Sequence, residues 1–255
     1  MKNLLLLVAG MMLAGCATLP DSKPHPSDPW ERFNRASFKV NDALDRGILR
    51  PTARAYVKVT PRVLRTGVSN FFDNLETVTT LVNDALQGKM RAAGQDTARL
   101  LLNSTLGLGG LLDPATQAGI AKNDEDFGQT LGMWGVASGP YLMVPLMGPT
   151  TVRDGLARIP DTFTDPSHYL EDDSTRYAIT AVEIVDLRAG LLDLDAQLAQ
   201  SFDRYAFVRN AWLQRREYKV RDGNVEEEAL DEEALMNEEP VPAPAPASDA
   251  PPAPQ

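Results

Sequence analysis

The sequence predicts an all-α protein whose helices are interrupted by one irregular loop rich in glycine and proline. Apolar residues recur at helical spacing toward both ends of the chain. The N-terminal half contains no convincing run of alternating apolar and polar β-formers. Between the two helical parts, residues 127–152 hold no charged residue but contain five glycines and three prolines.

The first helix is expected to begin at Asp28-Pro29-Trp30-Glu31. Asp28 can cap the helix, Pro29 suits the first helical position, and Glu31 can reach back in a capping box. One apolar face follows at helical spacing, formed by Trp30, Phe33, Val40 and Leu44. We expect residues 49–51 to end this helix, because proline disrupts a helix interior.

Three further helices are expected before the uncharged segment. Thr60-Pro61 opens the second, which carries an apolar face through Phe72. The third runs from about Asn74 to a stop at Gly88. The fourth covers roughly residues 89–103.

Residues 174–220 are expected to form one bent helix or two consecutive helices, with Gly190 at the bend. Their apolar stripe is more typical of core packing than of a cofactor site. The last turns carry Arg215, Arg216 and Lys219, which suit a helix C-terminus electrostatically. The alternative is a basic patch that contacts lipid phosphates, and these three residues are the candidates for it.

The uncharged segment, residues 127–152, is long enough to cross a bilayer, but its glycines and prolines exclude a single straight helix. Irregular backbone at membrane depth must be buried in protein or line a water-filled cavity. The segment therefore predicts short helices and a hairpin-like loop within a membrane leaflet, around a cavity. A buried glycine-rich loop of a soluble domain is the alternative, and the N-terminus favours the membrane.

The N-terminus resembles a bacterial lipoprotein signal. Lys2 precedes a short apolar stretch that closes with Leu13-Ala14-Gly15-Cys16. That stretch is too short for a membrane-spanning helix. Cys16 is the only cysteine, so no disulfide is expected, and its predicted role is to carry lipid. Ala17 is not acidic, so by resemblance to lipoprotein sorting rules the protein goes to the outer membrane and faces the periplasm of a Gram-negative cell.

Charge divides the chain into predicted regions. Residues 222–255 hold ten acidic and no basic residues, and they end in a Pro/Ala-rich tract that is expected to be disordered. This tail is expected to be a solvated spacer, or else a recruiter of a basic partner. Residues 1–221 balance 25 acidic against 25 basic residues, so nucleic-acid binding is not expected. The predicted regions are a signal peptide (1–15), an anchor linker (16–27), a helical domain (28–221) and the tail (222–255).

Catalytic patterns are missing from the sequence. His168 is the sole histidine expected within the folded part, and no Gly-x-Ser-x-Gly motif surrounds Ser138. The chain lacks a Walker loop, a dinucleotide fingerprint and metal-ligand spacing. The sequence therefore predicts no enzyme activity, no cofactor and no metal.

A series of short motifs resembles the MlaA (VacJ) family of outer-membrane phospholipid-transport lipoproteins. The resemblance keeps the family's order from residue 28 to about residue 212. The motifs are Asp28-Pro29, Glu31, Asn34-Arg35, Asp45-Arg46, Arg50-Pro51, Ser69-Asn70-Phe71, Asn74-Leu75, Leu86-Gln87-Gly88, Asn103-Ser104-Thr105, Gly107-Leu108-Gly109-Gly110, Phe127-Gly128-Gln129-Thr130-Leu131-Gly132, Gly139-Pro140-Tyr141, Gly148-Pro149 and Arg153-Asp154.

The resemblance implies a ring of amphipathic helices in the inner leaflet of the outer membrane, enclosing an amphipathic channel. Such proteins remove phospholipids mislaid in the outer leaflet, pass them to the periplasmic carrier MlaC and associate with trimeric porins. The uncharged segment would then form part of the channel wall or its gate. The candidate residues are Phe127, Gly132, Trp134, Gly135, Gly139, Pro140, Tyr141, Met143 and Pro145. For each glycine, a tight turn without a gating role is the alternative. A second function remains open, a lipoprotein that tethers or scaffolds porins without moving lipid.

Overall fold

The structure is a computed structural model, and it describes residues 25–224. Helices dominate, with one two-stranded sheet in the described part. The elements are α2 (Glu31–Leu44), the π-helical turn η1 (Asp45–Leu49), α3 (Arg50–Val59), α4 (Arg62–Leu86), α5 (Met90–Thr105), α6 (Pro114–Gln117), α7 (Phe127–Met133), β1 (Tyr141–Val144), β2 (Gly148–Thr151), α8 (Val152–Thr164), η2 (Pro166–Tyr169), α9 (Asp173–Gly190), η3 (Leu192–Leu194), α10 (Asp195–Gln200) and α11 (Arg204–Val220).

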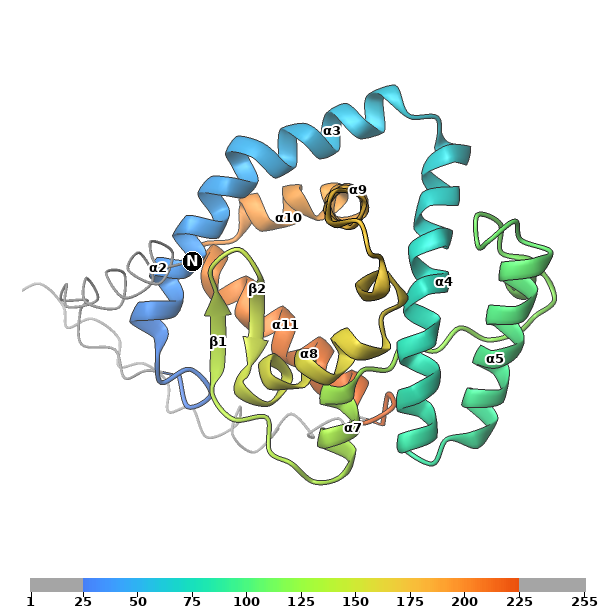
Figure 1. The fold of residues 1–255 in the computed structure, drawn as a ribbon. Coiled ribbons are helices and arrows are strands. Elements are labelled where there is room, and N and C mark those ends of the chain that lie inside the picture. The colour runs from blue at the N-terminus through green and yellow to red at the C-terminus, as the bar shows by residue number, and fades with distance from the viewer. Residues whose placement is uncertain (1–24, 225–255) are drawn as a thin grey trace, which may run out of the picture.

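The helices are arranged as a ring (Figure 1). α2, α3 and α4 follow successive sides of the outline, and α5 packs against the outer side of α4. The β1–β2 hairpin and α8 lie inside this outline, and α9 is seen nearly end-on inside it, where it packs against α3. The predicted all-α class and ring-like arrangement are confirmed. Within residues 25–224, none of the helices combines the length and the apolar character needed to cross a membrane.

The predicted end of the first helix at residues 49–51 is wrong. The backbone continues from α2 through η1 into α3 and ends at Val59. The π turn makes this possible, because the Arg50 N–H donates to the carbonyl of Asp45, five residues back. Pro51, which lacks an N–H, then falls in the first turn of α3, where a missing donor costs least.

The predicted capping box at the start of α2 is also wrong. Trp30 occupies the N-cap position, and no side chain caps it. Asp28 is fully buried instead, where it accepts a hydrogen bond from Nδ2 of Asn34 at 2.7 Å. The carboxylate is used for a tertiary contact, so it is not available to the first turn of the helix.

Residues 62–86 form one helix, α4, where the sequence predicted a break before Asn74. Asn74 lies within α4 and is buried. Its side chain packs closely against Gly110. A Cβ added to Gly110 would lie 2.7 Å from the Cβ of Asn74. The predicted stop at Gly88 is confirmed, with a φ of 75°, and the fourth predicted helix corresponds to α5.

The uncharged segment contains a short helix, α7, and an antiparallel hairpin in which Tyr141 faces Thr151 and Val144 faces Gly148. The expected short helix and hairpin-like loop are therefore confirmed. The sequence predicted an irregular loop, however, whereas the two arms of the hairpin are paired as regular β-strands. Leu146, at the turn, has a φ of 69°.

The last 50 residues of the predicted domain break near Gly190, as expected, into α9 and α11 with short helices between them. Only part of their apolar stripe packs in a core. Tyr205 is buried, and Val208, Trp212 and Leu213 pack against its cluster. Val182 and Leu187 of α9, and Leu191 and Leu194 in the turn that follows it, are exposed, so the core role predicted for that part of the stripe is wrong.

The predicted signal peptide, the lipid-bearing Cys16, most of the anchor linker and nearly all of the acidic tail lie outside the described residues.

Candidate functional site

The distribution of polar and apolar side chains is inverted relative to an ordinary globular protein. Among residues 25–224, 19 buried side chains are polar or charged and seven are hydrophobic. In the same range, 31 large hydrophobic side chains are exposed. Soluble proteins expose single apolar residues but rarely large continuous apolar surfaces. The described part therefore buries mainly polar side chains and exposes many large apolar ones.

The hairpin is held on the inner side of α2 by Asn34. The Asn34 Nδ2 donates to the carbonyl of Tyr141 at 3.1 Å, and the N–H of Met143 donates to Oδ1 of Asn34 at 2.8 Å. The Asn34 side chain thus pairs with a backbone carbonyl and a backbone N–H of strand β1, as a neighbouring strand would. Asn34 is fully buried, so these bonds are shielded from water.

Asn41, seven residues further along α2, fixes the hairpin turn. Its Nδ2 donates to the carbonyl of Val144 at 3.0 Å, and the N–H of Leu146 donates to its Oδ1 at 2.7 Å. The spacing of two helical turns places both asparagines on one face of α2. The irregular backbone of the uncharged segment is therefore satisfied by side chains of the ring.

Tyr141 and Met143 point into the small hydrophobic cluster of the described residues, together with Tyr205. The rings of Tyr141 and Tyr205 meet edge to face, with centroids 6.4 Å apart. The Tyr205 hydroxyl donates to Asp28, and Nη1 of Arg209 donates to the same carboxylate at 3.1 Å. Burial, and secondly the hydrogen bond to Asp28, raises the pKa of Tyr205 well above its ordinary value.

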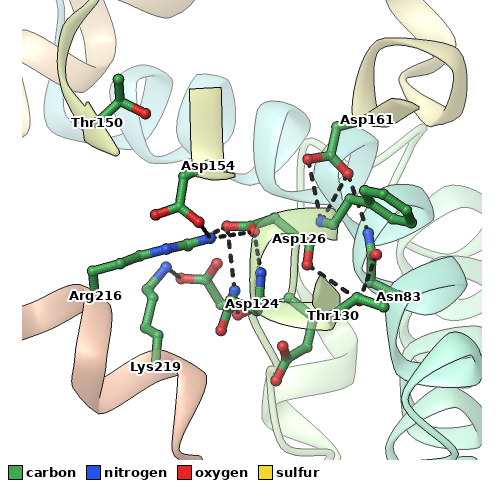
Figure 2. Close-up of polar contacts among 12 residues, drawn as sticks. Asn83, Asp124, Asp126, Thr130, Thr150, Asp154, Asp161, Arg216 and Lys219 are labelled. Atoms are coloured by element: carbon green, nitrogen blue, oxygen red, sulfur yellow. Dashed lines mark hydrogen bonds and ion pairs between the residues drawn. The ribbon is translucent and has the colours of Figure 1, made fainter. Parts of the chain in front are cut away.

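A second polar cluster joins α7, α8 and α11 (Figure 2). Arg216 on α11 donates to both oxygens of Asp126, at 2.5 and 2.7 Å, and to Oδ1 of Asp154 at 2.9 Å. Asp126 also caps α7, because the Gln129 N–H donates to its Oδ1 at 2.9 Å. Burial opposes ionisation of Asp126, but the hydrogen bonds and charge of Arg216, together with the Gln129 N–H and the charge of Lys219, outweigh it and hold the pKa of this carboxyl below its usual range.

Two glycines of α7 lie in close contact with charged side chains of this cluster. A Cβ on Gly128 would lie 2.4 Å from Nη2 of Arg216 and 2.5 Å from Oδ1 of Asp154. A Cβ on Gly132 would lie 2.7 Å from Nη1 of Arg153. These two residues of α7 thus let the helix approach the charged side chains.

Asp161 on α8 links the cluster to the ring helix α4. The N–H of Phe127 donates to both its oxygens, at 3.0 and 3.2 Å, and Nδ2 of Asn83 donates to Oδ1 at 3.3 Å. The hydroxyl of Thr130 in turn donates to Asn83 at 2.8 Å (Figure 2). Burial raises the pKa of the Asp161 carboxyl.

A cavity of about 410 Å³ lies at this cluster, within the size range of small-molecule sites. It has more cationic than anionic side chains. Its lining residues are Asp126, Thr150, Asp154, Arg158, Asp161, Trp212, Arg215, Arg216 and Lys219. The structure therefore brings together the three basic residues that the sequence predicted as phosphate contacts.

The nine candidate gate residues do not gather at one place. Phe127 stacks edge to face on Trp134, with centroids 6.2 Å apart, and Trp134 itself is 54% exposed. Gly135 and Gly139 lie on an exposed stretch between α7 and β1, with φ of 89° and 68°. The other candidates are Gly132 in α7, half-buried Pro140 before β1, buried Tyr141 and Met143 in β1, and half-buried Pro145 after it.

Sequence reasoning missed Asp126, Asp154 and Arg158, which line the cavity. One signal could have found the first two. Asp126 directly precedes the uncharged segment, and Arg153-Asp154 directly follows it. Charges that flank a long uncharged run are positioned to meet when the run folds back on itself as a hairpin.

One buried acidic pair lies outside this cluster, between α4 and α5. Asp84 is fully buried, Asp96 is 1% exposed, and neither oxygen of Asp84 has a hydrogen-bond partner among the described residues. Burial, and secondly the interaction with Asp96, raises the pKa of Asp84 to about 8. Asp84 is therefore protonated at neutral pH, which removes the cost of a second buried charge.

Comparisons with known proteins match nearly all of the described chain. The family model of the MlaA lipoprotein matches residues 26–219. The intermembrane phospholipid transport system lipoprotein MlaA of Escherichia coli (strain K12) is 37% identical over 218 residues, which covers 84% of this chain and 86% of that protein. The protein of the same name from Haemophilus influenzae is 30% identical and covers 90% of this chain and 95% of that protein. A solved structure, described as "Structural basis for maintenance of bacterial outer membrane lipid asymmetry", has a TM-score of 0.69 and 39% identity, and the match covers 76% of this chain and 99% of that one.

Proposed function

This chain belongs to the MlaA lipoprotein family, and on that premise we propose that it removes mislocalised phospholipids from the outer leaflet of the outer membrane. The lipids would pass through an amphipathic channel within the ring of helices to a soluble periplasmic carrier. The names of the relatives, which are lipoproteins of intermembrane phospholipid transport systems, support this proposal.

The observation that carries the proposal is the exposed apolar surface of α4 and of α5, which packs on the outer side of α4. This surface includes Val63, Leu64, Met90 and Leu101. Burying one Leu, Ile, Val or Phe side chain stabilises by about 1.5 to 3 kcal/mol, so this surface favours contact with lipid chains over water. We place the ring in one leaflet, as the family resemblance implies.

The polar interior supports passage of headgroups. Exposed backbone amides are costly at membrane depth, and here the side chains of Asn34 and Asn41 satisfy those of the hairpin. A ring that is apolar outside and polar inside excludes lipids approaching from the side, whereas a lipid lying above the ring can direct its headgroup into the polar interior. The depth of the ring in the membrane would then select phospholipids of the outer leaflet over those of the inner leaflet.

We assign the gate to the stretch between α7 and β1. Gly135 and Gly139 have backbone conformations that favour glycine, and a Cβ on Gly135 would meet nothing within 4 Å. Trp134 at the start of this stretch is exposed, and Met143 anchors its far end in the core. A loop that is anchored at both ends and exposed between them can move without unfolding the ring.

Localisation and partners complete the proposal. Lipidated Cys16 would anchor the chain in the outer membrane so that it faces the periplasm. The carrier would be MlaC and the outer-membrane partner a trimeric porin, both by family resemblance. We propose no chemistry on the lipid.

Transfer between purified components tests the proposal. Proteoliposomes that hold the full-length lipidated protein and a labelled phospholipid are mixed with the soluble carrier, and label on the carrier is measured after separation. Label should reach the carrier several times faster than from liposomes without the protein. Equal transfer with and without the protein, together with intact porin binding, would favour the alternative of a tether that moves no lipid.

A further inference from the structure

We propose that the cavity between α7, α8 and α11 binds the phosphate of a phospholipid headgroup through Arg158 and Arg215. This inference rests on the proposed lipid-transport function and names a binding site within it. It also divides the basic residues of the cavity into two that hold the protein together and two that meet the ligand.

Arg216 and Lys219 are already occupied by carboxylates. Arg216 makes three hydrogen bonds to Asp126 and Asp154, none longer than 2.9 Å, and its side chain is 11% exposed. The Lys219 Nζ lies 2.5 Å from Oδ2 of Asp124. A phosphate would have to displace these bonds, so these two cations position the cavity wall.

Arg158 and Arg215 differ from that pair. Both side chains line the same cavity, and both residues are exposed. Neither guanidinium forms an ion pair or a hydrogen bond with any residue in 25–224. Arg158 comes from α8 and Arg215 from α11, so they present two cations from two separate helices.

The carboxylates of the cavity do not cancel these free charges. The two charges of Asp126 and Asp154 are balanced by two cations, Arg216, which donates to both, and Arg153, whose Nε donates to Asp154 at 2.9 Å. Asp161 accepts from the Phe127 N–H, and burial raises the pKa of its carboxyl. The two unpaired guanidinium groups outnumber this one carboxyl group, so the free charge at the cavity is positive.

The chemistry of these groups selects phosphate. Each guanidinium presents a planar set of donors that matches two phosphate oxygens at once. Trp212 also lines the cavity and offers an apolar surface next to the arginines, which suits the glycerol part of a lipid. A free phosphate ion would use the same arginines but would gain nothing from Trp212, and this difference separates the two sources experimentally.

Trp212 can report binding in the full-length protein. The chain has three tryptophans, so the background Trp30→Phe/Trp134→Phe leaves Trp212 as the only one. Its emission is titrated with dihexanoylphosphatidylethanolamine below the critical micelle concentration, and separately with sodium phosphate. The test variant is Arg158→Gln/Arg215→Gln. The matched control is Arg62→Gln/Arg91→Gln, which removes the same charge from exposed residues that line other cavities.

We expect the lipid to change the emission saturably, the test variant to weaken its apparent affinity at least tenfold, and the control to leave it within twofold. Arg158→Lys/Arg215→Lys should retain part of the affinity. Equal losses in test and control, or no loss in the test variant, would overturn the site. Binding of phosphate that the lipid does not displace would overturn the headgroup assignment. These results do not depend on whether deletion of the gene changes the outer leaflet, so the site and the proposed function can fail separately.

Discussion

Arg216 on α11 donates to both carboxylate oxygens of Asp126, at 2.5 and 2.7 Å, and Asp126 is the residue that caps α7. This one pair joins the last helix of the described chain to the first element of the uncharged segment. The same guanidinium reaches Asp154 at 2.9 Å, at the start of α8. Both ends of the uncharged segment are therefore fixed by a single side chain.

Removing this side chain should destabilise the protein. Arg216→Met leaves Asp126 and Asp154 with fewer donors, and loss of hydrogen bonds to charged groups costs about 2 to 3 kcal/mol in the free energy of unfolding. Chemical denaturation of the purified protein measures the change. Arg215→Met is the matched control on the same helix and should cost less than about 0.5 kcal/mol, because Arg215 is exposed. Equal losses in the two variants would contradict the role given to Arg216.

Two glycine-to-alanine variants should have effects of opposite sign. In Gly128→Ala the new methyl group would overlap Arg216 and Asp154, so we expect a loss of about 1 to 3 kcal/mol in stability. Gly94 lies inside α5, and a Cβ there would meet nothing within 4 Å. Gly94→Ala should therefore stabilise by about 0.5 to 1 kcal/mol, through helix propensity alone. Thermal unfolding of both variants gives the comparison, and a neutral Gly128→Ala would show that α7 does not need this close approach.

Loss of Asn34 should release the hairpin from α2. Asn34→Ala leaves the Met143 N–H and the Tyr141 carbonyl without their side-chain partner in a buried place. Each unsatisfied buried group costs about 1 to 3 kcal/mol, so we expect a loss of about 3 kcal/mol or more. Gln214→Ala, at an exposed position of α11, should cost under about 1 kcal/mol. Hydrogen exchange at the Met143 amide measures the release directly, and unchanged protection there would be evidence against it.

Stability should decrease as the pH rises above the ordinary range of aspartate. Burial, and secondly Asp96, raises the pKa of Asp84 from 3.8 to about 8 in the folded protein. The folded state therefore keeps a proton that the unfolded chain loses, so this contribution is full below pH 3.8 and is lost as the pH rises through about 8.

The measurement is the free energy of unfolding between pH 5 and 9. Asp84→Asn keeps the neutral form at every pH and should flatten this slope. Asp172→Asn is the control, because the pKa of exposed Asp172 is lowered to about 2 by hydrogen bonds, first from the Thr175 side chain, and the group does not titrate in this window. If the free energy of unfolding of Asp84→Asn still falls with pH as in the unsubstituted protein, the pH dependence belongs to other groups.

Substitution in the proposed gate should slow transport more than it destabilises the fold. Gly135→Val places a branched side chain at a φ of 89°, where nothing lies within 4 Å, so the cost is local backbone strain of about 1 to 3 kcal/mol. Gly148→Val imposes the same kind of strain in the hairpin, at a φ of 86° and also with nothing within 4 Å. If the gate lies between α7 and β1, lipid transfer falls severalfold more in Gly135→Val than in Gly148→Val. Equal transfer in the two variants would leave Gly135 as a turn without a gating role.

The sequence predicted the helical class, the position of most helices and the family, because helical periodicity and short motifs are local signals. It failed where tertiary contacts override local preference. Asp28 looks like a helix cap but is used by Asn34, Tyr205 and Arg209, and Pro51 looks like a stop but is accommodated by a π turn. Neither outcome can be seen in the residues nearby.

The candidate site was predicted only in part, because its local signals can be read from the sequence and its tertiary contacts cannot. Arg215, Arg216 and Lys219 follow from a basic last turn, and the structure places all three at one cavity. Which of them are free depends on the carboxylates of other elements, Asp124, Asp126 and Asp154, and on the fold that brings them together. The apolar stripe of α9 was assigned to a core because helical spacing is the same whether a face meets protein or lipid.

The central claim is tested most directly by the phospholipid content of the outer leaflet, measured with a headgroup-selective probe on intact cells. The gene is deleted, restored, or restored with Cys16→Ala. We predict that outer-leaflet phospholipid rises on deletion and returns to its normal level only with the form that keeps Cys16. An unchanged leaflet together with impaired porin assembly or envelope attachment would contradict lipid removal and support the tether.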